Sequence, residues 1–178
     1  MCKLQVKKND SDLIQPESSL AGATFSCLFL YGMIQCKEMK NGGNIVLKKF
    51  RIETKRKENL YNITKDVVSA VNENSVQSGM AFVFSPHTTA GITINENADP
   101  DVVPDIVLGM DKAYPNRAEF LHAEGNSSAH LKTSAVGASE TVIIENGELL
   151  LGAWQGIYFC EFDGPRNRTF YVKIIRED

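Results

Sequence analysis

Residues 141–151, Thr-Val-Ile-Ile-Glu-Asn-Gly-Glu-Leu-Leu-Leu, contain the strongest indication of the fold. A two-residue hairpin turn of type I′ needs positive φ angles at both central positions, and Asn146-Gly147 is a preferred dipeptide for it. Apolar segments flank this dipeptide on both sides. Thr141–Glu145 and Glu148–Leu151 are therefore predicted to be two strands of one antiparallel hairpin.

The remainder of the chain from residue 45 mixes strands and helices. Strands are predicted where apolar residues alternate or form short runs, and helices where apolar residues recur at helical spacing after capping residues. The further strands are expected at 45–56, 80–85 and 91–95, and at 157–162 and 169–175 as a second pair around Asp163-Gly164-Pro165. The helices are expected from Asn62 or Thr64 to Ser75, from Asp99-Pro100 to Tyr114-Pro115, and from Asn126 or Ser127 through Ala135. Because strands and helices do not alternate regularly, an α+β fold with a mostly antiparallel sheet is predicted.

The first 44 residues differ in character from the rest of the chain. They show no clear period and end at the breaker Asn41-Gly42-Gly43, after which a regular pattern begins at Ile45. We therefore expect residues 1–44 to be an N-terminal extension, poorly ordered or atypical, and residues 45–178 to be a single domain. A chain of 178 residues is consistent with one domain.

Charge and composition exclude several partners. With 19 basic and 22 acidic residues the chain has no basic excess, so nucleic acid is not expected as a partner. Its longest apolar run, Ala21–Ile34, is too short to span a bilayer, and no membrane association is expected. The four cysteines show no C-x-x-C spacing, which favours free thiols in a reducing cytoplasm.

The three histidines of the chain lie in segments rich in polar and small residues. His87 follows a predicted strand in Ser85–Gly91, and such loops often present reactive groups. The sharpest cluster is His122-Ala-Glu124-Gly-Asn126-Ser-Ser-Ala-His130. If Asn126 begins a helix, His130 lies one turn later on the same face, and the free N–H groups there with nearby Lys132 form an anion site.

Three interpretations of this cluster stay open. The histidines can hold a divalent metal with Glu124 as ligand or base, although the P-C-x-x-C partner of a zinc deaminase H-x-E motif and the H-E-x-x-H motif are both absent. Alternatively, His130 or His87 acts as a general acid or base that Glu124 orients. In the third interpretation the histidines are structural and satisfy buried backbone groups.

Two further segments contain candidate binding residues. Trp154 and Gln155, between Gly152 and Gly156, can stack on a planar ring and read its edge, or Trp154 can simply fill the core. In the other segment, Gly164–Arg168, Arg166 and Arg168 lie on a predicted turn; arginine suits bidentate phosphate recognition, whereas charged turns are commonly only solvated.

Taken together, the segments 85–102, 122–132, 152–158 and 163–168 resemble the YjbQ family, also called the secondary thiamine-phosphate synthase family. The resemblance extends from about Ile45 to the C-terminus with four motifs in the expected order. It implies an antiparallel sheet curled into a half-barrel and covered by helices. It also implies a homotrimer with its site near a subunit boundary.

The resemblance further implies a transferase that joins a pyrimidine pyrophosphate to a thiazole phosphate, as a step in thiamine biosynthesis or as a secondary activity. Alternatives are a metal-dependent hydrolase and a trimeric protein that binds a small phosphorylated or heterocyclic metabolite. The cofactor expected is at most a divalent metal, Zn or Mg, and no organic cofactor. The expected catalytic residues are His87, Glu124, Asn126 and His130. The expected metal ligands are His87, His122 and His130. The expected substrate-binding residues are Asn95, Glu96, Lys132, Trp154, Gln155, Arg166 and Arg168.

Overall fold

The computed structural model describes residues 45–177, which contain eight strands and three helices. The strands are β1 (Ile45–Glu53), β2 (Asn59–Asn62), β3 (Ser78–Phe84), β4 (Ala90–Glu96), β5 (Ser139–Glu145), β6 (Glu148–Leu149), β7 (Gln155–Glu161) and β8 (Asn167–Arg176). The helices are α1 (Thr64–Asn72), α2 (Val102–Ala113) and α3 (Ser127–Val136). The extension predicted over residues 1–44 lies outside the described residues.

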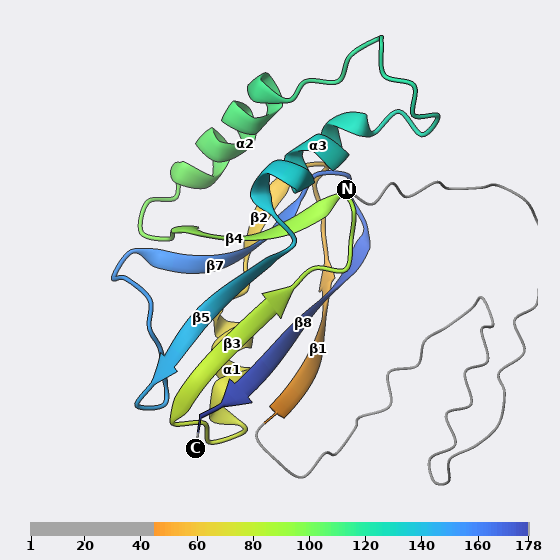
Figure 1. The fold of residues 1–178 in the computed structure, drawn as a ribbon. Coiled ribbons are helices and arrows are strands. Elements are labelled where there is room, and N and C mark those ends of the chain that lie inside the picture. The colour runs from red at the N-terminus through yellow and green to blue at the C-terminus, as the bar shows by residue number, and fades with distance from the viewer. Residues whose placement is uncertain (1–44, 178) are drawn as a thin grey trace, which may run out of the picture. The chain divides into compact units, whose positions relative to one another are not determined.

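The strands form two antiparallel sheets that curl into a half-barrel (Figure 1). One sheet has five strands in the order β1-β8-β3-β5-β6, and the other has three in the order β2-β7-β4. Each strand pair within these sheets is antiparallel. The predicted α+β half-barrel with covering helices is therefore confirmed. No helix within residues 45–177 is long and apolar enough to cross a membrane.

The core lies between the sheets and against α1. Alternate residues of β3 and β8 point inward, so that Ala81, Val83, Val172 and Ile174 are almost fully buried. The buried side of α1, centred on Val67, packs into the same cluster. A second, smaller cluster beneath α2 and α3 lies on the other side of the three-stranded sheet. The helices therefore contribute apolar side chains to both clusters, as the period of the sequence predicts.

The hairpin at residues 139–149 follows the sequence prediction closely. Asn146 and Gly147 have φ angles of 52° and 82°, the left-handed values that a type I′ turn requires. Ile144 pairs with Leu149 across the turn. The second strand is shorter than predicted, because β6 ends at Leu149.

The predicted pairing of residues 157–162 with 169–175 is wrong. Both segments are strands, but β7 lies in the three-stranded sheet and β8 in the five-stranded sheet. Each edge of β7 is occupied, by β2 on one side and by β4 on the other, so β8 cannot join it. The Asp163–Arg166 turn therefore carries the chain from one sheet to the other, and the candidate functional site is built around this crossing.

Candidate functional site

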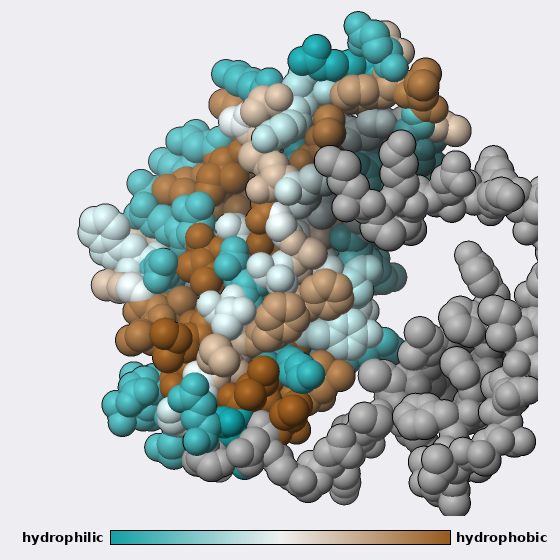
Figure 2. Space-filling view, in the orientation of Figure 1, coloured by the Kyte–Doolittle hydropathy of each residue, from teal (hydrophilic) through white to brown (hydrophobic). Residues whose placement is uncertain are grey.

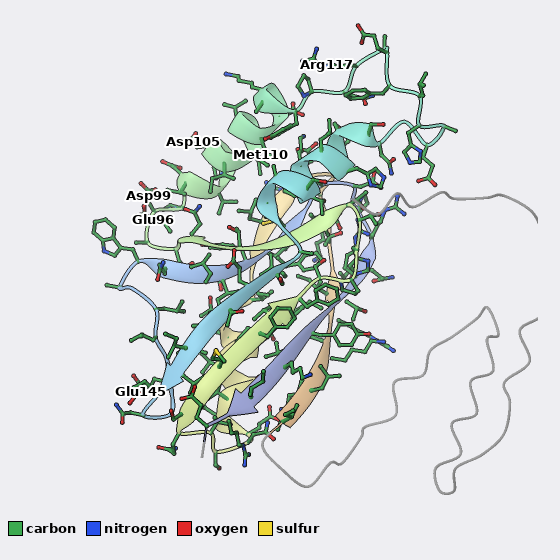
Figure 3. The ribbon with its side chains drawn as sticks, in the orientation of Figure 1. Glu96, Asp99, Asp105, Met110, Arg117 and Glu145 are labelled. Carbon is green, nitrogen blue, oxygen red and sulfur yellow. The ribbon has the colours of Figure 1, made fainter. Side chains whose placement is uncertain are left out.

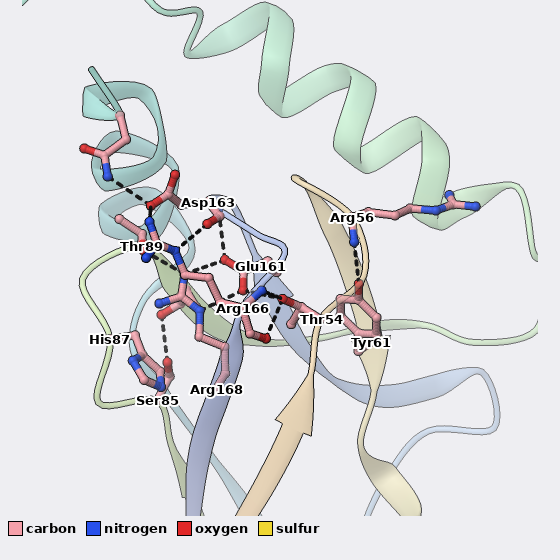
Figure 4. A network of polar contacts seen from close by, with 12 residues as sticks. Thr54, Arg56, Tyr61, Ser85, His87, Thr89, Glu161, Asp163, Arg166 and Arg168 are labelled. Atoms are coloured by element: carbon pink, nitrogen blue, oxygen red, sulfur yellow. Dashed lines mark hydrogen bonds and ion pairs between the residues drawn. The ribbon is translucent and has the colours of Figure 1, made fainter. Parts of the chain in front are cut away.

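A hollow of about 190 Å³ lies where three segments that are distant in sequence meet. Its walls are the loop between β3 and β4, the start of α3, and the turn between β7 and β8; much of this arrangement is drawn in Figure 4. The lining residues are Thr88, Thr89, Glu124, Asn126, His130, Asp163, Arg166 and Arg168. Five residues predicted from the sequence are in this set: Glu124, Asn126, His130, Arg166 and Arg168.

The loop after β3 is fixed by the buried Ser85. Its hydroxyl donates to the carbonyl of Ala90 at 2.8 Å, and its backbone N–H donates to the carbonyl of Ala138, also at 2.8 Å. Gly91 allows the end of α3 to lie directly against β4, because a Cβ at this position would be only 2.5 Å from the carbonyl oxygen of Gly137. The loop and α3 are thus held beside each other.

The floor of the site is a buried ion pair between Glu161 and Arg168. Arg168 donates from Nε and from one terminal nitrogen to the two carboxylate oxygens, at 2.7 and 2.6 Å. The same carboxylate accepts hydrogen bonds from the Thr54 hydroxyl at 3.0 Å and from the backbone N–H of Asp163 at 2.9 Å. With four donors the acceptor capacity of Glu161 is filled, and the ends of β1, β7 and β8 are joined at one point.

A second ion pair, between Asp163 and Arg166, forms one wall. Arg166 donates from Nε to the carbonyl of Asp163 at 2.7 Å and from a terminal nitrogen to its carboxylate at 2.6 Å. The backbone N–H of Arg166 donates to the hydroxyl of Thr54 at 2.8 Å. The orientation of this arginine is therefore set by the turn itself.

Asn126 is the residue before α3, but its side chain makes no capping bond. Its amide nitrogen donates instead to the carboxylates of Asp163 at 3.0 Å and Glu124 at 3.4 Å. Because two carboxylates face the nitrogen, a flip of the amide is unfavourable. The amide oxygen is left buried with no partner among the described residues, which costs about 1–3 kcal/mol unless a ligand donor fills it.

His87 is half-buried beside the floor. Its Nε2 lies 3.0 Å from both the backbone nitrogen and the backbone oxygen of Thr169, and its ring packs edge-on against Phe159. Burial lowers the pKa of His87 below its usual 6.5, and the nearby positive charge of Arg168 adds to this effect. These two effects favour the neutral imidazole, and the ring is bonded to the backbone of Thr169.

The predicted three-histidine metal site is wrong. The rings of His122 and His130 pack edge to face with centroids 5.2 Å apart, whereas Nε2 of His87 is engaged with Thr169. Within residues 45–177, no group of three or more His, Cys, Asp or Glu side chains is arranged to hold a metal ion. The alternative function of a metal-dependent hydrolase was based on this site and is no longer supported.

The remaining predicted site residues fall into two other places. Asn95, Glu96, Trp154 and Gln155 lie at the far end of the β4–β7 pair, where Glu96 is opposite Gln155. β4 has seven residues at about 3.3 Å each, so this end is on the order of 20 Å from the hollow. Trp154 is 68% exposed there and does not fill the core. Figure 3 shows Glu96 near Asp99, at the end of β4 that leads to α2.

Lys132 is also absent from the hollow. It is fully buried, and its ammonium group donates to both carboxylate oxygens of Glu58 at 2.7 Å and to Asp111 at 3.0 Å. The helix turns by about 100° per residue, so Lys132 points away from the face that carries His130. This cation joins α3 to α2 and to the chain just before β2.

Sequence reasoning missed the residues that support the site, Glu161, Asp163 and Thr54. A signal was present for Glu161, because a carboxylate at the end of the apolar run Ile157–Phe162 must find a buried partner. Its partner Arg168 was predicted to bind the substrate, and its ion pair with Glu161 was not predicted. Thr54 carried no such signal, since threonine is common in strands.

Comparisons with known proteins place this chain among proteins without an assigned activity. The model of the family described as UPF0047 protein YjbQ-like matches residues 48–177. The UPF0047 protein YugU of Bacillus subtilis is 53% identical over 131 residues, which are 73% of this chain and 99% of that protein. A crystal structure of an uncharacterized conserved protein from Clostridium acetobutylicum has 55% identity and a TM-score of 0.71, and the match covers 72% of this chain and 99% of that one. A YbjQ-like protein of unknown function from Sulfolobus solfataricus has 29% identity and a TM-score of 0.72, over 75% of this chain and 98% of that one.

The thiamine-phosphate synthase activity predicted from the sequence is therefore wrong, together with the transferase class and the role in thiamine biosynthesis. These relatives are named for an uncharacterised family, and their descriptions attach no reaction to it. Thiamine-phosphate synthase is the activity of a different family. The resemblance identified the family correctly but not what its members do.

Replacing Glu161 with Gln is expected to lower the free energy of unfolding by about 3–5 kcal/mol, because it leaves the buried guanidinium of Arg168 without its counter-charge. Urea denaturation measures this directly. Glu145→Gln is the control, since Glu145 is an exposed glutamate with no side-chain partner among the described residues, and it should change stability by no more than about 0.5 kcal/mol. A loss of under about 1 kcal/mol for Glu161→Gln would show that the pair does not organise the fold.

Stability is expected to fall as the pH is lowered from about 7.5 to about 5.5, and part of this fall should come from His87. The folded pKa of His87 is lowered from 6.5, so below that pH the unfolded chain binds the proton more readily and gains free energy relative to the folded one. In His87→Gln the urea midpoint should depend less steeply on pH over this range. An equally steep dependence in the variant would contradict the assignment.

Proposed function

The chain belongs to the UPF0047 YjbQ-like family, and from the geometry of its hollow we propose that it binds a small phosphorylated metabolite there. The observation that carries the proposal is the pair of arginines that line the hollow with their planes already fixed by carboxylates. A fixed guanidinium loses little freedom when it binds a phosphate, so the hollow is preorganised for such a group.

Both arginines retain free donors. A guanidinium has five N–H groups, and Arg166 donates two hydrogen bonds and Arg168 three to protein groups within residues 45–177. About three N–H groups of Arg166 and about two of Arg168 are therefore left for a ligand. The imidazole of His130 and the exposed Thr88 line the same hollow and add polar groups beside the arginines.

The other lining groups describe the rest of the ligand. The unpartnered amide oxygen of Asn126 and the carboxylate of Glu124 accept hydrogen bonds, so the ligand should carry hydroxyl or N–H donors next to its phosphate. Trp154 and Gln155, the residues that suited a heterocycle, lie at the other end of the strands. A phosphorylated ligand is thus favoured over a heterocyclic one.

The proposal includes assembly of three copies, as the family resemblance implies. The open face of the five-stranded sheet carries a row of apolar side chains paired across four strands, Ile45, Ile175, Met80 and Ile143. Ile45 and Ile143 are about half exposed, and apolar residues gather on this face in Figure 2. A contiguous apolar patch of this kind commonly marks a protein–protein interface.

A cytoplasmic location and independence from organic cofactors stay predictions. The buried free thiol of Cys160 is compatible with a reducing compartment. Burial raises the pKa of this thiol to about 12, which disfavours the nucleophilic thiolate form.

Inorganic phosphate is expected to bind saturably to the parent protein, and Arg166→Gln should weaken this binding about 10- to 100-fold, the loss typical of a charge-assisted hydrogen bond. Isothermal titration calorimetry measures the affinity. Arg166→Lys keeps the positive charge but lacks the planar guanidinium with its several donors, and it should recover part of the lost affinity. Arg117→Gln, at an exposed arginine in the loop between α2 and α3 that does not line the hollow, is the control for net charge. No saturable binding, or equal effects of Arg166→Gln and Arg117→Gln, would refute the proposal.

Met80→Lys is expected to convert the trimer into monomers, because it places a charge at the centre of the apolar row. Light scattering after size-exclusion chromatography gives the mass. Val68→Lys makes the same kind of change at an exposed position on α1 and should leave the mass unaltered. The idea fails if the parent is monomeric or if Met80→Lys remains trimeric with an unchanged circular dichroism spectrum.

A further inference from the structure

The charges around the hollow do not balance. Arg166 and Arg168 are the two cations that line it, and each already has its own carboxylate, Asp163 for the first and Glu161 for the second. Glu124 is a third carboxylate, and it lines the hollow without a lysine or arginine partner within residues 45–177. With neutral histidines, the site therefore carries one negative charge in excess before any ligand enters.

The contacts of Glu124 leave its charge largely free. Its carboxylate accepts one long hydrogen bond, from the side-chain amide of Asn126 at 3.4 Å, and lies 4.0 Å from Nε2 of His122. The amide is a neutral donor, and the histidine is at the outer limit of an ion pair and is charged only when it is protonated. The Glu124 side chain is 71% exposed, so a ligand that enters the hollow can reach it.

This excess charge restricts which phosphorylated ligands fit well. A phosphate monoester carries a charge of about −1.5 to −2 at pH 7, so its binding to the arginines brings further negative charge close to Glu124. Like charges that are placed near each other oppose binding, whereas a cation beside a carboxylate favours it. A ligand with its own cationic group near the phosphate supplies both the anion for the arginines and the counter-charge that Glu124 lacks.

The spacing between the two charges of such a ligand follows from a short series of contacts. Nδ2 of Asn126 lies 3.4 Å from the Glu124 carboxylate and 3.0 Å from that of Asp163, which in turn lies 2.6 Å from a terminal nitrogen of Arg166 (Figure 4). This nitrogen is therefore at most about 9 Å from the Glu124 carboxylate, and a hydrogen bond of about 2.8 Å at each end leaves a gap of about 3.5 Å or less along the line between them. An amine two carbon atoms from a phosphate ester oxygen spans about this distance.

We propose that the hollow selects a phosphorylated amine, in which a protonated amino group lies about two carbon atoms from the phosphate, and that Glu124 is the residue that selects it. The proposal rests on the proposed function, since it takes the phosphate to be bound by the arginines. A primary ammonium group brings three donors and a positive charge to a carboxylate that lacks a cation. A hydroxyl group in the same place supplies a donor but no charge, so Glu124 favours the amine.

The test compares two probes by isothermal titration calorimetry of the full chain at pH 8. They are O-phosphoethanolamine and propyl phosphate, which has the same length but a methyl group in place of the ammonium group. At this pH a free histidine side chain is neutral and a primary amine is charged. The parent protein should bind O-phosphoethanolamine at least about 10-fold more tightly than propyl phosphate, because only the first probe offers Glu124 a charged hydrogen-bond donor.

Three variants assign this preference to one carboxylate. In Glu124→Gln, which keeps the shape of the side chain and removes its charge, the preference should fall below about 3-fold. Glu124→Asp keeps the charge and should retain part of the preference. Glu119→Gln is the matched control, because Glu119 is an exposed glutamate in the same loop between α2 and α3 that does not line the hollow, and the parent preference should be unchanged there.

The outcomes separate this inference from the function on which it rests. If propyl phosphate binds and Arg166→Gln weakens its binding, but O-phosphoethanolamine binds no more tightly, the selection of an amine is refuted and the phosphate site remains. Equal effects of Glu124→Gln and Glu119→Gln on the preference refute the role of Glu124. If neither probe nor inorganic phosphate binds, the phosphate site fails and the selection of an amine fails with it.

Discussion

The buried pair of Glu161 and Arg168 is the interaction on which the candidate site depends. Each ion would cost several kcal/mol to bury alone, so the fold must bring the two together and supply the remaining donors. Thr54 and the backbone of Asp163 do so, which ties β1 and the Asp163–Arg166 turn to the end of β7. The wall of the hollow follows from this constraint, because the same turn sets the orientation of Arg166.

Local features of the fold could be predicted from the sequence, whereas the question of which strands pair with each other could not be answered from it. The hairpin at Asn146-Gly147 and the strand from Ile45 are determined by neighbouring residues, and both are present. The pairing of β7 with β8 was predicted only from their proximity in sequence, and it fails because β2 and β4 occupy both edges of β7. The four-residue β2 was missed, since Asn59–Asn62 is too short and too polar to show alternation.

The candidate site shows the same difference between local features, which the sequence predicts, and long-range positions, which it does not. Asn126 and His130 share a helix face through their spacing of four residues, and the structure brings both to the hollow. Lys132, only two residues further, lies on the opposite side and joins α3 to Glu58 and Asp111. Asn95 is close in sequence to His87, but the length of β4 separates them. The resemblance of the motifs identified the family, but it gave no information on how far apart the motif residues lie. A shared fold does not by itself determine a reaction.

The pairing of both arginines has a consequence for selectivity. Glu161 and Asp163 cancel most of the positive charge of Arg168 and Arg166, so the hollow does not attract anions through a strong field. The chain as a whole, with a net charge of −3, does not attract them either. What remains are N–H groups in fixed directions and an unpartnered acceptor on Asn126. Under the proposed function, recognition therefore depends on the match of directions between ligand and protein more than on net charge.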